Sequence, residues 1–343
     1  MLGGKLSALL VAFTAVTAGC IAPTEANDES VETSEVSTGL TKACTPESPR
    51  PNDVEVFALP DAGTAPFVNE IAKAKSSIRL MIYELSSKPI VDALIDRAKA
   101  GVDVQVIFDK DEKTINQPAF DALEKAGAEC KWSLSKFSYM HAKAFVVDDA
   151  VAVITSSNFV TGYMSRERNF VAIDRDADDA KSLAAVFDAD WNNRYASASC
   201  TRLVISPNNS RARIVSFIDS ATKSIRVESM QLQDPAIRKA LADKQAAGVK
   251  VEVILADPRW ITANNDAATF LKASNIAVRS LSYPDVHTKS IVIDGEKAYL
   301  GSENFTTVSL FRNREIGIVV TEKANAQLMN VTFTADWASA SPM

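Results

Sequence analysis

The chain repeats itself, because its second half carries the same short segments as its first half, in the same order. Ser77-Ile78-Arg79 returns as Ser224-Ile225-Arg226, and Phe187–Trp191 returns as Phe333–Trp337. Similarity at so long a period indicates duplicated structural units, and two copies argue for a duplicated domain rather than a solenoid. A chain of 343 residues has room for roughly two ordinary domains. We therefore expect a body made of two similar repeats, with the tryptophan that closes each second segment packed in a core.

Within each half, helices and strands are predicted to alternate. Gly101 and Gly248 stand where a helix C-cap favours glycine, and the apolar runs that follow are typical of strands buried on both faces. The expected elements are 66–75, Ser77–Tyr83, 88–100 and Val102–Phe108 in the first half, and 211–221, Ser224–Ser229, 235–247 and Val249–Leu255 in the second. This alternation predicts an α/β fold with parallel pairing of these strands.

A hairpin is predicted to follow in each half. Its strands are Ala142–Asp148 and Val151–Thr155 in the first half, and Ser290–Ile293 and Ala298–Leu300 in the second. The second pair is joined through Asp294-Gly295, a strong turn signal. The chain has only two histidines, His141 and His287, and each opens one hairpin. So few histidines exclude a metal centre built from several of them.

Both histidines have the same neighbours, in the pattern H-x-K-x-x-x-x-D. Residues i and i+2 of a strand share a face, so each lysine is expected beside its histidine. A neutral imidazole can attack or transfer protons, while an ammonium group neutralises the oxygens of an anionic substrate. The aspartates fall near the turns, where we expect them to brace the hairpins behind the site. The two sets are His141, Lys143 and Asp148, and His287, Lys289 and Asp294.

Two further segments recur after the hairpins. Ser156 and Asn158 are matched by Ser302 and Asn304, and these side chains can hydrogen-bond phosphate oxygens. Capping of local turns is the alternative role for them. Next, Arg166-Glu167-Arg168-Asn169 is matched by Arg312-Asn313-Arg314-Glu315. The arginines of this second pair suit either a solvated surface or a functional role.

These residues resemble the phospholipase D superfamily, whose members carry H-x-K-x4-D followed by G-S-x-N, twice. The resemblance covers nearly all of residues 53–343, and the second copy is complete, whereas the first has Thr155 where the second has Gly301. It implies an α/β fold of two pseudo-symmetric α/β/α repeats, at 53–200 and 201–343, with the active site at their interface. It also implies that neither a metal nor another cofactor is required.

The resemblance further implies a covalent mechanism. One histidine attacks phosphorus to form a phosphohistidine, and the other protonates the leaving alcohol and then activates water or a second alcohol. In the family, an acid from each half supports the histidine of the other half. Here Glu315 would orient His141, whereas Asn169 stands in place of the acid behind His287. Because an amide cannot stabilise an imidazolium by charge, we predict that His141 is the nucleophile and His287 the general acid and base.

The first 19 residues are predicted to be an export signal. Lys5 precedes an apolar, uncharged run that is too short to span a bilayer. The run ends at Cys20 in a sequence similar to a bacterial lipobox, from which it departs at Thr17. We therefore expect lipidation of Cys20 and a location at the bacterial cell envelope, with plain secretion as the alternative. Residues 20–52, rich in Glu, Ser and Thr, are expected to form an acidic, disordered, lipid-anchored tether.

The charge of the chain bears on its substrate. The net charge is −6, and most of it belongs to the tether, so the body is nearly neutral. A nuclease would need a basic groove for its phosphates. We therefore expect a monomeric phospholipase D-type hydrolase that cleaves phospholipid head groups at a membrane surface. The alternatives are, in order, a nuclease of the same superfamily, a phosphatidyl-transferase and a catalytically silent surface-binding lipoprotein.

Three further cysteines, Cys44, Cys130 and Cys200, allow at most one internal disulfide. Export would permit a disulfide, but the spacing does not select the pair. Free and partly buried thiols are the equal alternative.

Overall fold

The computed structural model describes residues 54–196 and 201–343. The predicted export signal, Cys20 and the tether lie outside the described residues, as do Cys44 and Cys200. Cys130 is a free, half-buried thiol. Burial, together with the nearby charge of Glu124, raises the pKa of Cys130 to about 12, so the thiol stays protonated at neutral pH.

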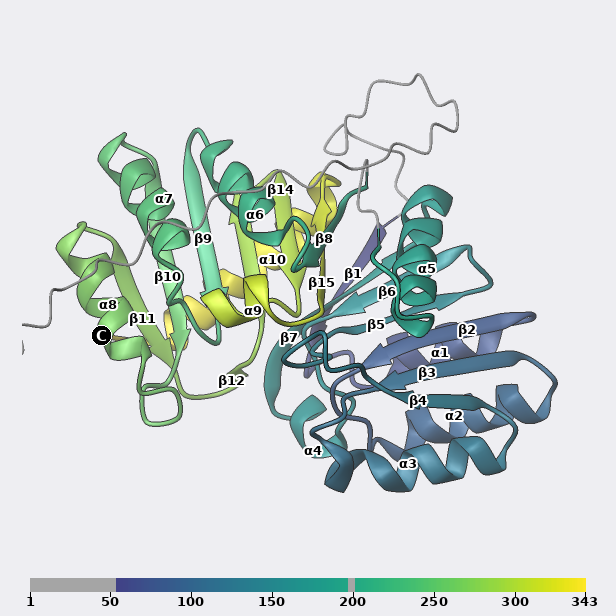
Figure 1. Cartoon of the computed structure of the whole chain (residues 1–343). Coiled ribbons are helices and arrows are strands. Elements are labelled where there is room, and N and C mark those ends of the chain that lie inside the picture. The colour runs from purple at the N-terminus through teal and green to yellow at the C-terminus, as the bar shows by residue number, and fades with distance from the viewer. Residues whose placement is uncertain (1–53, 197–200) are drawn as a thin grey trace, which may run out of the picture. The chain divides into compact units, whose positions relative to one another are not determined.

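The described residues form two mixed eight-stranded sheets with helices around them (Figure 1). The first half contains β1 (Val54–Leu59), α1 (Ala65–Lys73), β2 (Ser77–Ile82), α2 (Lys88–Lys99), β3 (Asp103–Phe108), α3 (Lys113–Lys125), β4 (Glu129–Trp132), β5 (Lys143–Val147), β6 (Val151–Thr155), α4 (Thr161–Met164), β7 (Glu167–Asp174) and α5 (Ala177–Trp191). The second half contains β8 (Leu203–Ser206), α6 (Ser210–Asp219), β9 (Ser224–Ser229), α7 (Pro235–Ala246), β10 (Lys250–Ala256), α8 (Asn264–Ala273), β11 (Ala277–Leu281), β12 (Asp285–Val286), β13 (Lys289–Ile293), β14 (Lys297–Gly301), α9 (Thr307–Phe311), β15 (Glu315–Val320), α10 (Lys323–Ser339) and β16 (Ser341–Pro342).

The strand order confirms a mixed α/β fold. The first sheet runs β1-β7-β6-β5-β2-β3-β4, with β12 paired to β7 as its eighth strand, and the second runs β16-β11-β10-β9-β13-β14-β15-β8. Parallel pairing joins β2 to β3 and β3 to β4, and likewise β9 to β10 and β10 to β11. Where the chain turns back through the hairpins, pairing is antiparallel, as at β5 with β6 and β13 with β14. Positive φ angles at Asp148, Asp149, Asp294 and Gly295 make those tight turns possible.

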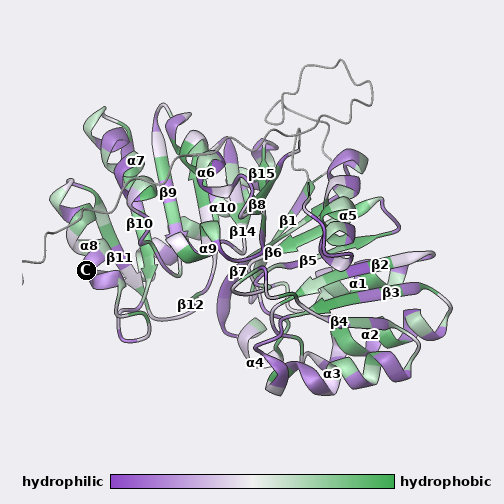
Figure 2. Cartoon of the chain, viewed as in Figure 1, coloured by the Kyte–Doolittle hydropathy of each residue, from purple (hydrophilic) through white to green (hydrophobic). Residues whose placement is uncertain are grey.

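Three hydrophobic clusters account for the main layers. One lies between the first sheet and α1, α2 and α3, and another lies between the second sheet and α6, α7 and α8. The third contains residues of α5, α10 and strands of both sheets, so the two halves share one core. In Figure 2 the strands of both sheets are largely hydrophobic, whereas α2 and α3 mix hydrophobic and hydrophilic residues. Among the helices in the described ranges, none is long and apolar enough to cross a membrane.

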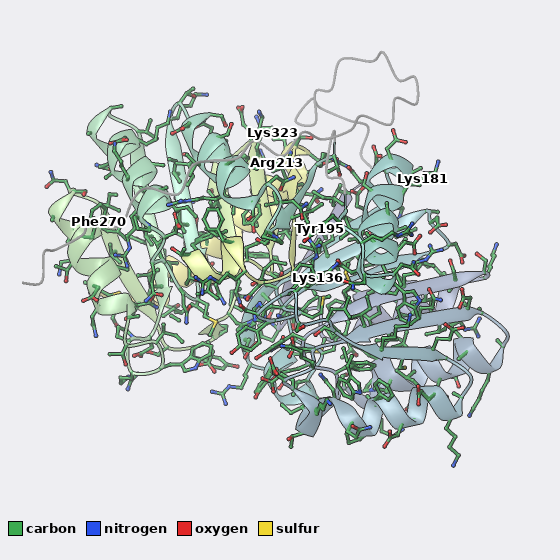
Figure 3. All side chains as sticks on the ribbon, viewed as in Figure 1. Lys136, Lys181, Tyr195, Arg213, Phe270 and Lys323 are labelled. Atoms are coloured by element: carbon green, nitrogen blue, oxygen red, sulfur yellow. The ribbon has the colours of Figure 1, made fainter. Side chains whose placement is uncertain are left out.

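The repeated segments 187–191 and 333–337 join the halves. Arg314 donates from Nε to Asp190 at 2.6 Å, and Arg168 does the same to Asp336 at 2.6 Å. All four side chains are buried, and each pair links one half to the other. Lys136, labelled in Figure 3, also reaches Asp190, with Nζ 3.3 Å from Oδ1. Two of the repeated arginines are therefore internal clamps, and Trp191 and Trp337 stack on Phe187 and Phe333 as expected of packing residues.

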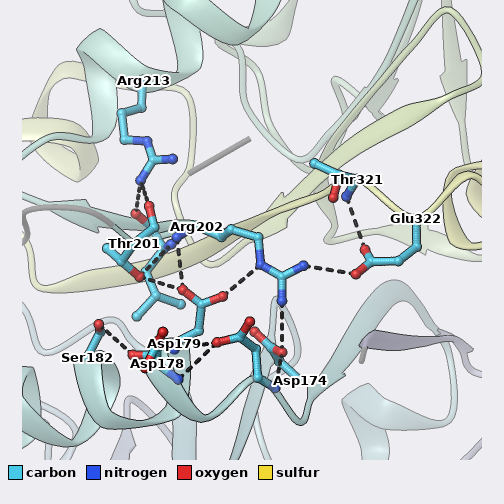
Figure 4. A network of polar contacts seen from close by, with 11 residues as sticks. Asp174, Asp178, Asp179, Ser182, Thr201, Arg202, Arg213, Thr321 and Glu322 are labelled. Carbon is cyan, nitrogen blue, oxygen red and sulfur yellow. Dashed lines mark hydrogen bonds and ion pairs between the residues drawn. The ribbon is translucent and has the colours of Figure 1, made fainter. Parts of the chain in front are cut away.

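A second, unsymmetrical link is centred on Arg202, which is fully buried. Its guanidinium donates to Asp179 at 2.7 Å, to Glu322 at 2.9 Å and to Asp174 at 3.0 Å (Figure 4). Asp174 and Asp179 belong to the first half, and Glu322 precedes α10 of the second. A buried charge is tolerated only when it is paired, so this cluster depends on both halves being in place.

Candidate active site

Each histidine is held by the backbone of the opposite half. The amide of His141 donates to the carbonyl of Arg314 at 2.9 Å, and the amide of His287 donates to the carbonyl of Arg168 at 3.2 Å. Just before His287, β12 pairs in parallel with the start of β7, and Met140 bridges to Arg314 in the same way. The clamps to Asp190 and Asp336 fix those two arginines. The histidines therefore meet where the two repeats join.

His141 stands against a carboxylate. Its Nδ1 lies 2.8 Å from Oε2 of Glu315, and the other carboxylate oxygen accepts from Ser309 at 2.5 Å and from Asn313 at 3.0 Å. A carboxylate only accepts hydrogen bonds, so Nδ1 carries the proton and Nε2 keeps its lone pair. Burial lowers the pKa of His141, and Glu315 opposes that shift. Burial would raise the pKa of Glu315, but the adjacent His141 keeps it below its usual range.

His287 stands against an amide. Its Nδ1 lies 3.1 Å from Oδ1 of Asn169, as the sequence led us to expect. A carboxylate is also present, because Oε2 of Glu167 lies 3.5 Å from the same nitrogen. Burial, with the charges of Lys289 and Lys143, lowers the pKa of His287 well below its usual value. Trp260 stacks beside the ring at 6.5 Å between centroids.

The two motif lysines are fully buried beside the histidines. Lys143 donates to the carbonyl of His141 at 2.8 Å, and Lys289 donates to the carbonyl of His287 at 2.5 Å. Burial lowers the pKa of Lys143 to about 8 and that of Lys289 to about 7. Burial destabilises the charged form of both lysines. A bound anion would stabilise that form, so the two lysines are well suited to bind an anionic group.

The serines and asparagines that were predicted to bind phosphate are tied to the framework. Ser156 donates to Oδ1 of Asn169 at 2.7 Å, and Ser302 accepts from the amide of Ile316 at 3.0 Å. Asn158 donates to Glu84 at 2.6 Å, whereas the side-chain oxygen of Asn304 is buried without a hydrogen-bond partner. Both serines are fully buried. Their contacts support the strands behind the site, and a direct role toward phosphate stays a prediction.

The motif aspartates lie at the opposite ends of their strands from the histidines. Asp148 accepts from the amides of Lys75, Ser76 and Ser77, and the shortest of these contacts is 2.8 Å. Asp294 accepts from the amides of Thr222, Lys223 and Ser224, with a shortest contact of 2.7 Å. These contacts confirm the expectation that the aspartates brace the hairpins. They hold each hairpin to the turn that precedes β2 or β9.

Sequence reasoning missed three acids near the histidines: Glu84, Glu167 and Glu303. Glu303 is fully buried, accepts from Tyr299 at 2.6 Å, and has its pKa raised by burial to about 8. Its position, x in G-S-x-N, gave a signal that was not used. Glu84 is buried, and burial raises its pKa to about 7. Glu167 gave a weaker signal, since only the pairing of β12 with β7 brings it to His287.

Glu303 also explains why one motif has glycine and the other threonine. A Cβ on Gly301 would lie 2.5 Å from Cα of Gly317 and would collide with the carboxylate of Glu303. In the first half Ser157 takes the place of Glu303, and the larger Thr155 fits, donating to the carbonyl of Phe170 at 2.8 Å. The departure at Thr155 is therefore a local packing solution.

Within residues 54–196 and 201–343, no group of three or more His, Cys, Asp or Glu side chains is arranged to hold a metal ion.

Comparison with known proteins agrees with this geometry. The family described as "Cardiolipin synthase, PLD-like domain" matches residues 67–191 and again residues 214–337. The cardiolipin synthase of Clostridium perfringens (strain SM101 / Type A) is 25% identical over 338 residues, which covers 83% of this chain and 70% of that protein. The phospholipase D of Rickettsia bellii (strain RML369-C) is 34% identical over 127 residues, 36% of this chain and 63% of that protein.

Among solved structures, the fold is similar to that of the phosphatidylserine synthase of Haemophilus influenzae Rd KW20. The TM-score is 0.68 at 13% identity, covering 86% of this chain and 88% of that one. A polyphosphate kinase from Porphyromonas gingivalis has a TM-score of 0.65 at 16% identity, covering 83% of this chain and 50% of that one. The doubled motif and the two matched repeats show that this chain belongs to the phospholipase D superfamily, as a member with both repeats in one polypeptide.

Proposed function

We propose that this protein is a phospholipase D-type phosphodiesterase that cleaves the head group from a phospholipid through a phosphohistidine intermediate. The observation that supports this most directly is a pair of histidines, His287 buried and His141 partly exposed, each with a buried lysine beside it, where Nδ1 of His141 faces a carboxylate and Nδ1 of His287 an amide. Such a site provides a nucleophile, a proton donor and charge neutralisation together.

In the proposed reaction, Nε2 of His141 attacks phosphorus and the bond to the head-group oxygen breaks. Lys143 and Lys289 neutralise the non-bridging oxygens as charge builds up on them. The low pKa of His141 keeps the ring neutral before attack, and Glu315 stabilises the positive charge that develops on it. His287, protonated when the anionic substrate is bound, donates to the leaving oxygen. Neutral His287 then removes a proton from water, which attacks phosphorus and releases phosphatidate and His141.

A second candidate is transfer of the phosphatidyl group to an alcohol, which would replace water in the last step. It is favoured by the matches to cardiolipin synthases. Because the first half of the reaction is the same, the two candidates differ only in what His287 activates.

The test is to incubate the purified chain with vesicles of phosphatidylglycerol and with vesicles of phosphatidylcholine, and to separate the lipid products. Phosphatidate with free head group supports hydrolysis, and predominant cardiolipin from phosphatidylglycerol supports transfer. His141→Ala is the matched control, since it should remove either product. Cleavage of single-stranded DNA, with no lipid product, would overturn the proposal in favour of a nuclease.

We also propose that the body is held at the cell envelope through a lipidated Cys20. A fatty-acid label should attach to the wild-type chain in bacterial cells and disappear in Cys20→Ala. Label that persists in Cys20→Ala, or none on the wild type, would contradict the anchor without affecting the proposed chemistry.

A further inference from the structure

The segments behind the two histidines carry the same two residue types in exchanged order. In β7 a glutamate precedes an asparagine by two positions, at Glu167 and Asn169, whereas Asn313 precedes Glu315 in the second half. The strand pairing shows that these positions are equivalent, because Thr155 faces Val171 in the first sheet and Gly301 faces Gly317 in the second. Each histidine therefore has one carboxylate and one amide behind it, but in opposite order.

In the second half the carboxylate touches the histidine and the amide supports the carboxylate. Nδ1 of His141 lies 2.8 Å from Glu315, and Asn313 donates to the other oxygen of Glu315 at 3.0 Å. The carboxylate itself dictates the tautomer of His141, because it can only accept.

In the first half the amide touches the histidine, and an amide does not dictate a tautomer. Its oxygen would accept from a protonated Nδ1, but its NH2 group would donate to an unprotonated Nδ1, so the two orientations select opposite tautomers. Ser156 contacts the oxygen of Asn169 at 2.7 Å. Ser156 donates to that oxygen here, but a hydroxyl could equally accept from the NH2 group of a rotated amide, so Ser156 alone does not fix the orientation.

Glu167 selects one of these two orientations of the Asn169 amide. Nδ2 of Asn169 donates to Oε2 of Glu167 at 3.3 Å, and a carboxylate cannot donate back. With the NH2 edge of the amide held by Glu167, the oxygen must face His287. Glu167 is buried, and burial, with the nearby charge of Asp285, raises its pKa, while Lys289, the hydrogen bond from Asn169 and Arg166 oppose that rise and favour the ionised, accepting form.

We propose that Glu167 is a positioning residue for His287: it locks the side-chain amide of Asn169 so that His287 is held with the proton on Nδ1 and the lone pair on Nε2. The inference deepens the proposed function, since only that tautomer presents Nε2 to accept and return the substrate's proton. Asn169 connects the two groups: its NH2 group donates to Glu167, and its oxygen accepts from Nδ1 of His287. The carboxylate of Glu167 itself lies 3.5 Å from that nitrogen.

The tautomer can be read directly, because the chain has only two histidines. Nitrogen-15 NMR of the ring nitrogens in the uniformly labelled full-length chain gives two ring systems, which His141→Ala assigns. In the wild type both rings should show the Nδ1–H form at neutral pH. In Glu167→Gln the ring of His287 should lose that form, wholly or in part, because a glutamine can donate to Asn169 as well as accept. His141 should be unchanged, which makes it an internal control for folding.

Kinetics give a second reading. Glu167→Gln should lower kcat by roughly 10- to 100-fold, the usual cost of removing a group that orients a working histidine, with KM altered less than about two-fold. Glu252→Gln is the matched control, since Glu252 is a buried glutamate of β10 paired with Arg226 at 3.2 Å, and it should leave both readings unchanged. The double variant Glu167→Asn with Asn169→Glu copies the second half and should restore the Nδ1–H form.

Three outcomes would overturn the proposal: an Nε2–H form of His287 in the wild type, an unaltered Nδ1–H form in Glu167→Gln, or failure of the double variant to regain it. If Glu167→Gln does not fold, the wild-type spectrum and the double variant still decide the question. None of these spectra depends on which substrate is cleaved, so failure of the proposed function would leave the tautomer result intact.

Discussion

The carboxylate that faces His141 and the amide that faces His287 occupy equivalent places in two halves that share one backbone plan. The exchange of glutamate and asparagine between these places changes the charge behind each ring but leaves the strands and the backbone hydrogen bonds to each histidine alike. A duplicated scaffold can thus give its two histidines different proton affinities without altering their positions. The proposed division of labour between the histidines depends on two residue pairs rather than on a difference in fold.

The residues that pack behind the two motifs also differ between the halves as a set. Behind the second motif, Tyr299, Gly301, Glu303 and Gly317 form one interlocking set, and Val153, Thr155, Ser157 and Val171 replace them in the first half. Each set fits only as a whole, since glycine is needed where a glutamate is buried and threonine is tolerated where a serine is. The halves have therefore diverged by exchanging whole packing sets.

Removing each histidine in turn should cause the largest loss of activity. His141→Ala should lower turnover on the order of 10⁴-fold and leave no covalent intermediate. His287→Ala should slow turnover by a similar factor, because it removes both the proton donor for the leaving oxygen and the base for water, and any labelled phosphatidyl group that forms should be found on His141. Rapid quenching in denaturant followed by peptide mapping measures both. Label found on His287 in His141→Ala would reverse the two assignments.

Removing the charge behind one histidine tests whether the two halves differ as their geometry indicates. Glu315→Gln should lower turnover by roughly 10³-fold, because the carboxylate contacts His141 at 2.8 Å and stabilises the imidazolium directly. That loss should exceed the loss in Glu167→Gln, whose carboxylate acts through an amide. Pre-steady-state rates of phosphoenzyme formation provide the measurement. Equal losses in the two variants would show that the exchanged order has no consequence.

The packing sets can be compared through stability. Gly301→Ala should destabilise the protein by about 2–3 kcal/mol, because the new methyl group meets the backbone of Gly317 and the buried Glu303. Thr155→Gly should cost only about 1–2 kcal/mol, from one lost hydrogen bond and added backbone freedom. Urea unfolding of both variants checks the difference.

Importing the whole first-half set provides the control for that experiment. The combination of Tyr299→Val, Gly301→Thr, Glu303→Ser and Gly317→Val should be more stable than Gly301→Ala alone, because it removes the acid with which the methyl group collides. A combination less stable than the single change would disprove the idea of interchangeable sets.

The smallest expected effect concerns the hairpin aspartates, where the halves behave alike. Burial works to raise the pKa of Asp148, but hydrogen bonds from the Ser77, Ser76 and Lys75 amides lower it from 3.8 to about 2. A pKa lowered by folding adds stability that is fully present above about pH 4 and is lost as the pH falls toward 2. Asp148→Asn should therefore cost about 1 kcal/mol at neutral pH, since the group is half-exposed and screened.

The cost of Asp148→Asn should shrink as the solution is acidified, and Asp294→Asn should show the same trend, because the pKa of Asp294 is lowered by equivalent contacts. Unfolding free energies of wild type and variants, measured across the acidic range, provide the check. A cost that grew on acidification would contradict the assignment.

Much of the fold was readable from the sequence because the duplication repeats every signal twice. The helices and strands around Gly101 and Gly248, and both hairpins, occur as expected, with ends shifted by a few residues. The antiparallel edges, such as β1 on β7 and β15 on β8, were not predicted. These strands pair with partners remote along the chain, and nothing in their own patterns names those partners.

The site divides in the same way. Spacing was enough to identify His141, Lys143, His287 and Lys289, and to match Glu315 with Asn169. Glu167 was missed because its reach to His287 depends on the register between β12 and β7. The sequence did not distinguish the buried arginines Arg168 and Arg314 from surface residues. Their partners, Asp336 for Arg168 and Asp190 for Arg314, lie on helices of the other half.

The backbone hydrogen bonds from His141 to Arg314 and from His287 to Arg168 have a consequence for how substrate enters. A hinge motion that swung the two halves apart, like jaws, would break those bonds and dismantle the catalytic pair before it widened the entrance. Substrate must therefore enter with the two halves held together, and movement on entry is left to side chains near the histidines, such as Trp260, which stacks beside His287 and is 45% exposed. Entry of substrate and the integrity of the histidine pair are in this way separated, because the backbone that holds the two histidines need not move.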